Sequence, residues 1–357
     1  MTAWRNAASL ILIARHAQKY KCPTQSSAYN YNVLSLKRHQ KSNFMPGLYV
    51  FPGGNISPAD SDPKWRELFV AFGFNNDSFA SLIPDTAVRP QIFKSQQNEL
   101  SREISLRITA IRETFEECGT LICRRRDDRA FSVWAQHLSV PKKELRVWQR
   151  KIHDNAMEFL TFCKQFECFP DLWALHEWSN WLTPTYLPNR YNTVFYMACM
   201  QSAPYAEYDT IEIEDLNWGT PENIWSSKDI VLPPPQQYEV AKLAKFQNID
   251  HVLDCAVQRG KVGVQLYLPV RVNLKDGTVF VLCGDTMYPK EIDPTATLVI
   301  NKSDISMDKF REMTPMKHRM ESNGARMTIF HSDDVQTITC NRVSSDTSAN
   351  QQVKNRP

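Results

Sequence analysis

The stretch ITAIRETFEECGTLI at residues 108–122 constrains the fold of this chain most, because its charges suit an isolated helix poorly. At the helical period of about 100° per residue, Glu113, Glu116 and Glu117 fall within one narrow arc. The opposite pole carries apolar residues: Ile104, Ile108, Ile111 and Phe115. The spacing therefore predicts a helix over 103–118 with one buried stripe and one acidic stripe.

The three glutamates lie at positions where negative charge destabilises a helix. Like charges three or four residues apart repel by about 0.2–0.5 kcal/mol per pair. Glu116 and Glu117 also precede Gly119, a residue suited to ending a helix, where anions oppose the dipole by about 0.3–1 kcal/mol each. A solvated acidic face is one interpretation. Acids converging at this end favour a second interpretation, a divalent cation, and oxygen ligands select Mg²⁺ or Mn²⁺ over zinc.

Two motifs together resemble the Nudix box, G-x5-E-x7-R-E-U-x-E-E-x-G-U, where U is a bulky aliphatic residue. Its second half is matched by Arg112, Glu113, Glu116, Glu117 and Gly119, with Thr114 and Thr120 at the two aliphatic positions. GNISPAD, from Gly54 to Asp60, resembles the first half, with Asp60 in place of the usual Glu. Arg112 stands 52 positions after Asp60 instead of eight, so an insertion of 44 residues splits the box. Added loop length costs little entropy, which makes such an insertion tolerable.

The split box is similar to the acyl-coenzyme A diphosphatase branch of the Nudix superfamily, nucleoside diphosphate-linked moiety X motif 19. The resemblance extends over residues 4–290, and the further segments that carry it are WRNAASLILIAR, FMPGLYVFPGG, EWSNWLTPTYLPNRYNTVFYM, LNWGTPENIW, VLPPPQQYEVAKL and GDTMYP. It implies an α/β fold, the Nudix α/β/α sandwich with a mixed β-sheet. The Nudix domain is expected at 4–240, with the insertion at 61–103 lying over the surface. A helical and β extension is expected at 241–340, and the polar composition of 341–357 predicts a disordered tail.

Hydrophobic patterns predict further elements outside the box. Expected strands are 8–14, 31–36, 192–200 and 211–218; expected helices are 141–166 and 232–246; and a hairpin at 264–282 is turned by Asp276-Gly277. No acid precedes Asp60, while seven Lys and Arg residues do, which is compatible with a mitochondrial presequence. The β-branched run ASLILIAR (8–15) favours a folded strand there instead.

The resemblance implies a substrate and a set of site residues. This branch hydrolyses CoA or acyl-CoA to 3′,5′-ADP and (acyl-)4′-phosphopantetheine with Mg²⁺ or Mn²⁺. The implied catalytic residues are Arg112, Glu113, Glu116 and Glu117, and the implied metal ligands are the same three glutamates with a backbone carbonyl of Gly54. Asp60, being shorter than Glu, is expected to orient the loop or Arg112 rather than to bind metal.

A coenzyme A motif before the box implies the substrate-binding residues. The family pattern L-L-T-x-R-[SA]-x3-R-x3-G-x3-F-P-G-G is matched at Arg38, Gly47 and Phe51-Pro52-Gly53-Gly54. The chain departs from this pattern at Ser35-Leu36, His39 and Asn43. The expected substrate-binding residues are Arg38, Lys41, Gly47 and Gly53. No general base is identified; Glu207, Asp209 and Glu212 are late candidates, each also readable as a surface acid.

The composition bears on three further properties: the state of the cysteines, membrane spans and partners. The nine cysteines contain no CxxC pair, and the gaps Cys118/Cys123 and Cys163/Cys168 lack a matching histidine set, so reduced thiols and no zinc site are expected. The apolar runs fall short of the roughly 20 residues of a membrane span. The net charge of +3 by itself argues neither for nor against an anionic partner. A small-molecule substrate and no nucleic-acid partner are expected from the resemblance, and the oligomeric state is left open.

Alternatives remain for substrate and location. Other Nudix substrates are ADP-ribose, a dinucleotide or an RNA cap; a non-catalytic binding module and an unrelated α/β protein are further readings. The branch is peroxisomal, which implies the same location here. The chain ends in Asn355-Arg356-Pro357 rather than an SKL-like tripeptide, so mitochondrion and cytosol stay open.

Overall fold

The computed structural model describes residues 4–16, 28–42, 44–85, 89–126, 132–324 and 327–331, with the backbone of 337–340. The tail predicted at 341–357 lies outside these residues. No helix in the described ranges is both long and apolar enough to cross a membrane.

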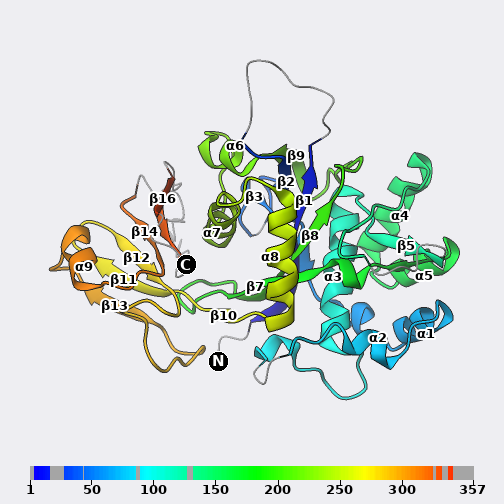
Figure 1. Cartoon of the computed structure of the whole chain (residues 1–357), viewed down its shortest axis with the longest axis horizontal. Coiled ribbons are helices and arrows are strands. Elements are labelled where there is room, and N and C mark those ends of the chain that lie inside the picture. Colours follow the sequence, from blue (N-terminus) through cyan, green and yellow to red (C-terminus); the bar gives the residue numbers. More distant parts are fainter. Residues whose placement is uncertain are drawn as a thin grey trace, which may run out of the picture.

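A mixed sheet forms the centre of the molecule (Figure 1). Its strands are β1 (Arg5–Arg15), β2 (Tyr31–Arg38), β3 (Tyr49–Val50), β4 (Gly53–Asn55), β7 (His176–Leu182), β8 (Tyr191–Met200), β9 (Ile213–Gly219) and β10 (Leu266–Tyr267). Their order is β10-β7-β8-β1-β2-β3, with β4 also paired to β1 and β9 to β2. The pairs β1–β8 and β10–β7 are parallel, and the others are antiparallel.

Helices cover both faces of this sheet. Helix α3 (Arg102–Cys118) lies on one face, and α7 (Pro234–Leu243) with α8 (Ile249–Val262) lies on the other. Successive side chains of a strand point to opposite faces, so Leu10 and Leu12 join the core of α3 while Ile11 and Ile13 join that of α7 and α8. The predicted α/β/α sandwich with a mixed sheet is confirmed.

The loop before the insertion ends in η1 (Pro58–Ser61), and the insertion holds α1 (Lys64–Ala71), α2 (Asn76–Ala80) and η2 (Gln91–Phe93). The prediction that it lies over the surface was incomplete, because Trp65 and Phe69 are fully buried. The Phe74 ring stacks on Trp173 at 4.4 Å, and Phe69 meets Phe169 edge-on at 6.3 Å. The expected two-striped helix is therefore also corrected: with the insertion packed against it, α3 is buried on nearly all sides.

Beyond α3 the chain forms a small layer on the same side. Its elements are β5 (Cys123–Arg125), α4 (Lys142–Asp154), α5 (Glu158–Gln165), β6 (Cys168–Pro170) and η4 (Leu172–Ala174), and α6 (Pro221–Ser226) follows β9. The single helix predicted at 141–166 was wrong, since it breaks at Asn155. This residue is extended at the end of α4, and its side-chain oxygen accepts the Met157 N–H at 3.1 Å. Such local side-chain bonds compete with helix continuation.

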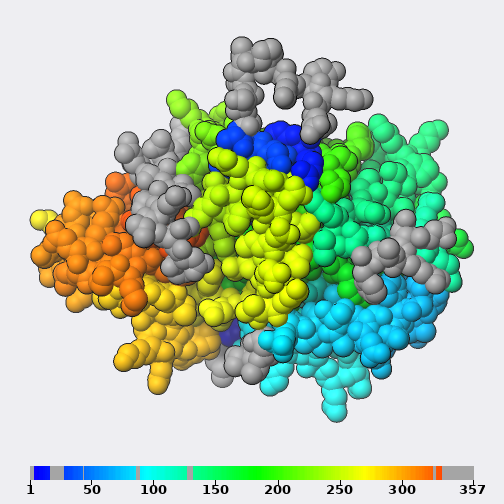
Figure 2. All heavy atoms as spheres, viewed as in Figure 1, coloured from blue at the N-terminus to red at the C-terminus, as the bar shows by residue number. Residues whose placement is uncertain are grey.

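The C-terminal part forms a second sheet at the opposite end from the insertion (Figure 1). It comprises β11 (Val270–Leu274), β12 (Thr278–Val281), β13 (Val299–Lys302), β14 (Arg319–Ser322), β15 (Met327–Phe330) and β16 (Thr337–Cys340), with helix α9 (Met307–Met313). The hairpin turned by Asp276-Gly277 is confirmed, since Asn273 pairs with Thr278. In Figure 2 the yellow segment that contains α8 lies between the orange C-terminal sheet and the green and cyan part of the molecule.

The buried aromatics of α1 predict how strongly the insertion is bound. Phe69→Ala should destabilise the protein by about 3–5 kcal/mol, because a buried ring is replaced by a cavity. Val70→Ala on the same helix is the control: its side chain is 56% exposed, and we expect a change of about 0.5 kcal/mol or less. Urea unfolding would measure both. Equal small shifts would show that the insertion adds little to the core.

Candidate active site

Helix α3 ends in a defined way, which fixes the positions of its acids. Ser101 accepts the Glu103 N–H at the start, and Gly119 adopts the left-handed conformation (φ 67°) after the end. The last carbonyls of α3 meet the following segment, since Glu117 and Cys118 accept N–H groups of Asp209 and Glu207 at 3.0 and 2.9 Å. Glu113, Glu116 and Glu117 thus occupy the last turns of a helix with fixed ends.

Arg112 joins the two halves of the split box. Its Nε and Nη2 donate to the two carboxylate oxygens of Asp60 at 2.7 and 2.9 Å. Its Nη1 lies 2.6 Å from Glu116 Oε1, and its Nη2 lies 2.9 Å from Glu113 Oε1. The guanidinium is almost completely buried. It therefore links the residues before the insertion to the helix after it.

Asp60 is committed to these contacts. Besides Arg112, it accepts the Thr109 hydroxyl at 2.8 Å and the Ser57 N–H at 2.9 Å. The second bond belongs to a capping box that starts η1. Asp60 is 1% exposed, and the expectation that it orients Arg112 agrees with this geometry.

The glycine pair brings β4 close to the acids. The Gly53 N–H donates to Glu117 Oε2 at 2.9 Å. A Cβ added at Gly54 would lie 2.4 Å from the carboxyl group of Glu113, so a side chain there cannot coexist with this approach. Gly54 pairs with Ala8 of β1, which anchors the loop to the central sheet.

The carboxylates repel one another in a buried setting. Burial raises the pKa of Glu113 to about 7, with Arg112 opposing the rise and Glu116 adding to it. Burial and the charge of Glu113 raise the pKa of Glu117 well above its usual range, against the Gly53 N–H and Arg38. Burial also raises the pKa of Glu116, and Arg112 opposes that rise. Glu116 and Glu117 are only 8% and 3% exposed, which excludes the interpretation as a solvated acidic face.

This donor set fits a hard divalent cation. Asp60, Glu113 and Glu116 contact the Arg112 guanidinium, and Glu117 lies next to them against the Gly53 N–H. These four carboxylates exceed the one guanidinium by three negative charges when all are ionised. Oxygen donors of this kind suit Mg²⁺ or Mn²⁺. Within the described residues, the oxygens of the three glutamates do not all lie within 4.8 Å of one another. Two of them are turned toward Arg112 and one toward Gly53.

The structure places the predicted substrate-binding residues unequally. Arg38 ends β2 and is near enough for its charge to oppose the raised pKa of Glu117. Gly47 lies in the following turn with φ 69°, and its N–H donates to the Arg38 carbonyl at 3.2 Å. Lys41 is exposed in that turn. The roles of these residues, and of the Gly54 carbonyl, stay predictions.

The structure adds residues to the site that were not predicted from the sequence, and it distinguishes between the late acidic candidates. Thr109 was missed, although it stands three positions before Arg112 on the same helix; Asn55, whose carbonyl accepts from Arg112 at 3.2 Å, gave no signal. Among the late acids, Glu207 pairs with Arg146, whereas the charge of Glu212 raises the pKa of both Glu116 and Glu117.

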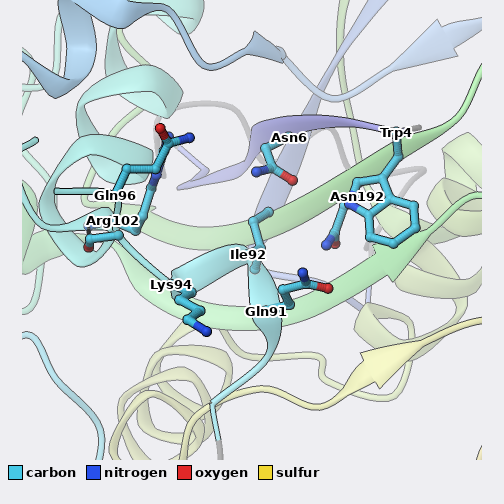
Figure 3. A pocket seen from close by; sticks show the side chains of 9 residues that line it. Trp4, Asn6, Gln91, Ile92, Lys94, Gln96, Arg102 and Asn192 are labelled. Carbon is cyan, nitrogen blue, oxygen red and sulfur yellow. Dashed lines mark hydrogen bonds between the residues drawn. The ribbon is translucent and has the colours of Figure 1, made fainter.

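A hollow of about 300 Å³ lies elsewhere (Figure 3). It is lined by residues that include Asn6, Asn192, Lys94 and Arg102, and none of the box carboxylates is among them. Arg102 begins α3, and at 1.5 Å per residue Glu113 is about 16 Å further along the helix. This hollow is therefore separate from the acidic site.

Comparison with known proteins identifies the family. The profile described as the NUDT19 Nudix domain matches residues 4–243. The chain belongs to the NUDT19 Nudix family. Acyl-coenzyme A diphosphatase NUDT19 from Xenopus laevis is 34% identical over 316 residues, covering 82% of this chain and 83% of that protein. The human protein of the same name is 33% identical over 310 residues, covering 81% and 82%.

A solved structure shows the same fold. The crystal structure of a NUDIX hydrolase from Alicyclobacillus acidocaldarius superimposes with a TM-score of 0.52 at 20% identity. The superposition covers 71% of this chain and 97% of the Alicyclobacillus chain. The family and the fold agree, and NUDT19 relatives match most of the chain.

The Asp60–Arg112 pair predicts a stability effect. Asp60→Asn should destabilise the protein by about 3 kcal/mol, because a buried guanidinium loses a charged partner. Asp62→Asn is the control, since Asp62 is only half-buried and its side chain accepts a single exposed backbone N–H from Lys64. Denaturant unfolding gives both values. A neutral Asp60→Asn would mean that the pair does not hold the two halves together.

The raised pKa of Glu113 predicts a pH-dependent response to metal. As pH rises from about 4.5 to about 7, the unfolded chain gives up this proton first, so the metal-free folded state loses stability across that window. A cation favours the ionised carboxylate. Mg²⁺ should therefore raise the melting temperature more at about pH 8 than at about pH 6. Glu113→Gln should narrow that difference, whereas an equal Mg²⁺ effect at both pH values would contradict the site.

Proposed function

We propose that this chain is a divalent-metal-dependent acyl-coenzyme A diphosphatase. It hydrolyses the diphosphate of CoA and acyl-CoA to 3′,5′-ADP and (acyl-)4′-phosphopantetheine. The observation that carries the proposal is the set Glu113, Glu116 and Glu117, of which Arg112 holds the first two and the Gly53 N–H holds the third. Two relatives that match over four-fifths of the chain bear the name acyl-coenzyme A diphosphatase.

The chain's own groups would hold the cation in a fixed place. Glu113, Glu116 and Glu117 would supply carboxylate oxygens, and we name Mg²⁺ as the working ion with Mn²⁺ as its substitute. Arg112 sets the direction of two of these carboxylates and Gly53 that of the third. Such supporting contacts restrict carboxylate motion and keep the oxygens near one place. Bound there, the ion would offset diphosphate charge and lower the pKa of a bound water.

Positive side chains on the neighbouring turn would bind the substrate phosphates. Arg38 stands on the last residue of β2, and its charge already reaches Glu117. A guanidinium suits phosphate because it can donate two parallel hydrogen bonds. Lys41, Gly47 and the Gly53 loop complete the proposed contact surface. The peroxisomal location implied by the resemblance also stays a proposal, which imaging of the untagged chain would test.

Product analysis tests the proposal directly. With Mg²⁺, the purified protein should convert CoA or acyl-CoA to 3′,5′-ADP. Glu117→Gln should lower kcat at least about a hundredfold, because the cation loses a carboxylate ligand. Glu144→Gln, at an exposed position of α4, should leave the rate unchanged. Mass spectrometry identifies the products, and circular dichroism checks that the variants fold.

Two results would contradict the proposal. Turnover of ADP-ribose equal to or greater than that of CoA would place the enzyme on another Nudix substrate. Full activity of Glu117→Gln would remove this carboxylate from the metal site. Replacing Mg²⁺ by Mn²⁺ in the same assay tests the choice of ion.

A further inference from the structure

Three cysteines outside the acidic site meet in the core beside α3. Cys123 begins β5, Cys163 lies in α5, and Cys168 begins β6. Their Sγ atoms all lie within 4.8 Å of one another, and each residue is at most 2% exposed. Among the described residues, no other set of three Cys, His, Asp or Glu side chains meets this distance.

The fold explains why these thiols meet although their spacing in the sequence gives no motif. Strands β5 and β6 are antiparallel, with Cys123 opposite Pro170 and Arg125 opposite Cys168. Opposed residues and those two apart share a face, so Cys123 and Cys168 lie on the same face of this ladder. Cys163 of α5 approaches that face.

Single buried cysteines elsewhere in the chain show the ordinary structural role. The Cys118 thiol donates to the Thr114 carbonyl at 3.0 Å, one turn back in its own helix. Cys199 is buried in the opposite core layer among apolar side chains. Buried free cysteines generally pack as small apolar side chains. The set Cys123, Cys163 and Cys168 differs because three separate elements direct their sulfur atoms toward one point.

We propose that Cys123, Cys163 and Cys168 form a site for one thiophilic metal ion, with Zn²⁺ as its occupant. Zn–S bonds of about 2.3 Å put tetrahedral sulfur ligands roughly 3.8 Å apart, so a contraction of about 1 Å or less would form the site. The three thiols release their protons to solvent as the Sγ–metal bonds form. This reverses the expectation of no zinc site drawn from cysteine spacing.

Charge selects Zn²⁺ among thiophilic ions. Three thiolates with Zn²⁺ leave one negative charge, whereas a monovalent ion such as Cu⁺ would leave two. Burial penalises uncompensated charge, which favours the divalent ion. Arg125, opposite Cys168 in the ladder, offers the compensating positive charge. The sulfur donors also distinguish this site from the oxygen donors of the glutamates, which suit Mg²⁺.

The site would fasten the layer that supports the end of α3. Phe159 and Phe162 of α5, both in the turn before Cys163, pack on Phe115 of α3 with ring centroids 6.5 and 5.5 Å apart. An ion joining β5, α5 and β6 would therefore stabilise the support of the acidic turn. This proposal does not depend on the proposed hydrolase activity.

The full-length protein, stripped of metal and kept reduced, tests the site. Titration with Cd²⁺, a spectroscopic substitute for Zn²⁺, should give thiolate-to-metal charge-transfer absorption that saturates at one ion per chain. Carboxylate ligands give no such band, and Glu117→Gln should retain it. One equivalent of Zn²⁺ should displace Cd²⁺ and so abolish the band. The bound Zn²⁺ should remain after dialysis and should raise the melting temperature of the protein. Absence of the band, or a band that does not saturate at one ion, would overturn the proposal.

Variants assign the ligands. Cys163→Ser and Cys168→Ser should each lose the band and the Zn²⁺-dependent rise in melting temperature. Cys199→Ser, buried in the other core layer, and Cys283→Ser, exposed, should keep both. Retention of the band in Cys163→Ser and Cys168→Ser would place the metal elsewhere and overturn the assignment.

A measurement on the unsubstituted protein tests the proposal even if the cysteine variants fail to fold. Under mild denaturant, Zn²⁺ should slow alkylation of Cys123, Cys163 and Cys168 at least about tenfold, but not that of Cys199, as mapped by mass spectrometry. Equal alkylation with and without Zn²⁺ would overturn the proposal. So would a disulfide between two of the three in protein held under reductant, because those thiols would not be metal ligands.

Discussion

The buried guanidinium of Arg112 is the contact on which the rest of the site depends. A charge removed from water is costly unless partners surround it, and Asp60, Glu113 and Glu116 provide them. The same contacts hold together two segments separated by the insertion. Lengthening the connection from eight to 52 residues adds only about 1.7 kcal/mol of closure entropy for a flexible loop. The bidentate ion pair between Arg112 and Asp60, with the hydrogen bond from the Thr109 hydroxyl to Asp60, is enough to offset this entropic cost.

The insertion acts on the other half of the same helix. Arg89 donates to Glu103 at the start of α3 and to Glu177 of β7, at 2.7 and 2.6 Å. This places a second guanidinium between the insertion, the helix and the sheet. Helix α3 is thus held by ion pairs near both ends and by aromatic packing between them. The acidic turn at the end of so well-supported a helix has little freedom to shift its carboxylates, which favours a preorganised site.

The sequence predicted the parts of the fold that local chemistry determines. The helix at 103–118 agrees with α3 to within one residue, since Ser101 and Gly119 mark its ends. The strands and the hairpin at Asp276-Gly277 were likewise found from alternation and turn residues. The pairing of Asp60 with Arg112 could be expected because the box has a known spacing, even when it is interrupted.

What was missed depends on contacts between segments distant in sequence. Helices α1 and α2 are too short for a clear period, so the burial of Phe69 against Phe169 left no local signal. The break at Asn155 follows from one side-chain bond inside an otherwise regular apolar pattern. The meeting of Cys123 with Cys163 and Cys168 arises from the ladder β5–β6, which cysteine spacing does not encode.

The parallel pairing of β1 with β8 has a consequence for how the protein is made. Arg5 lies opposite Tyr191, so the central strand finds its neighbour only after 186 further residues have been added. At synthesis rates of about 5–20 residues per second, that delay is roughly ten to forty seconds. Throughout it, β1 can pair with β2 and β4, but its other edge has no partner from its own chain. The ribosome-bound intermediate therefore carries an open apolar strand edge, which can pair with another chain until β8 has been made.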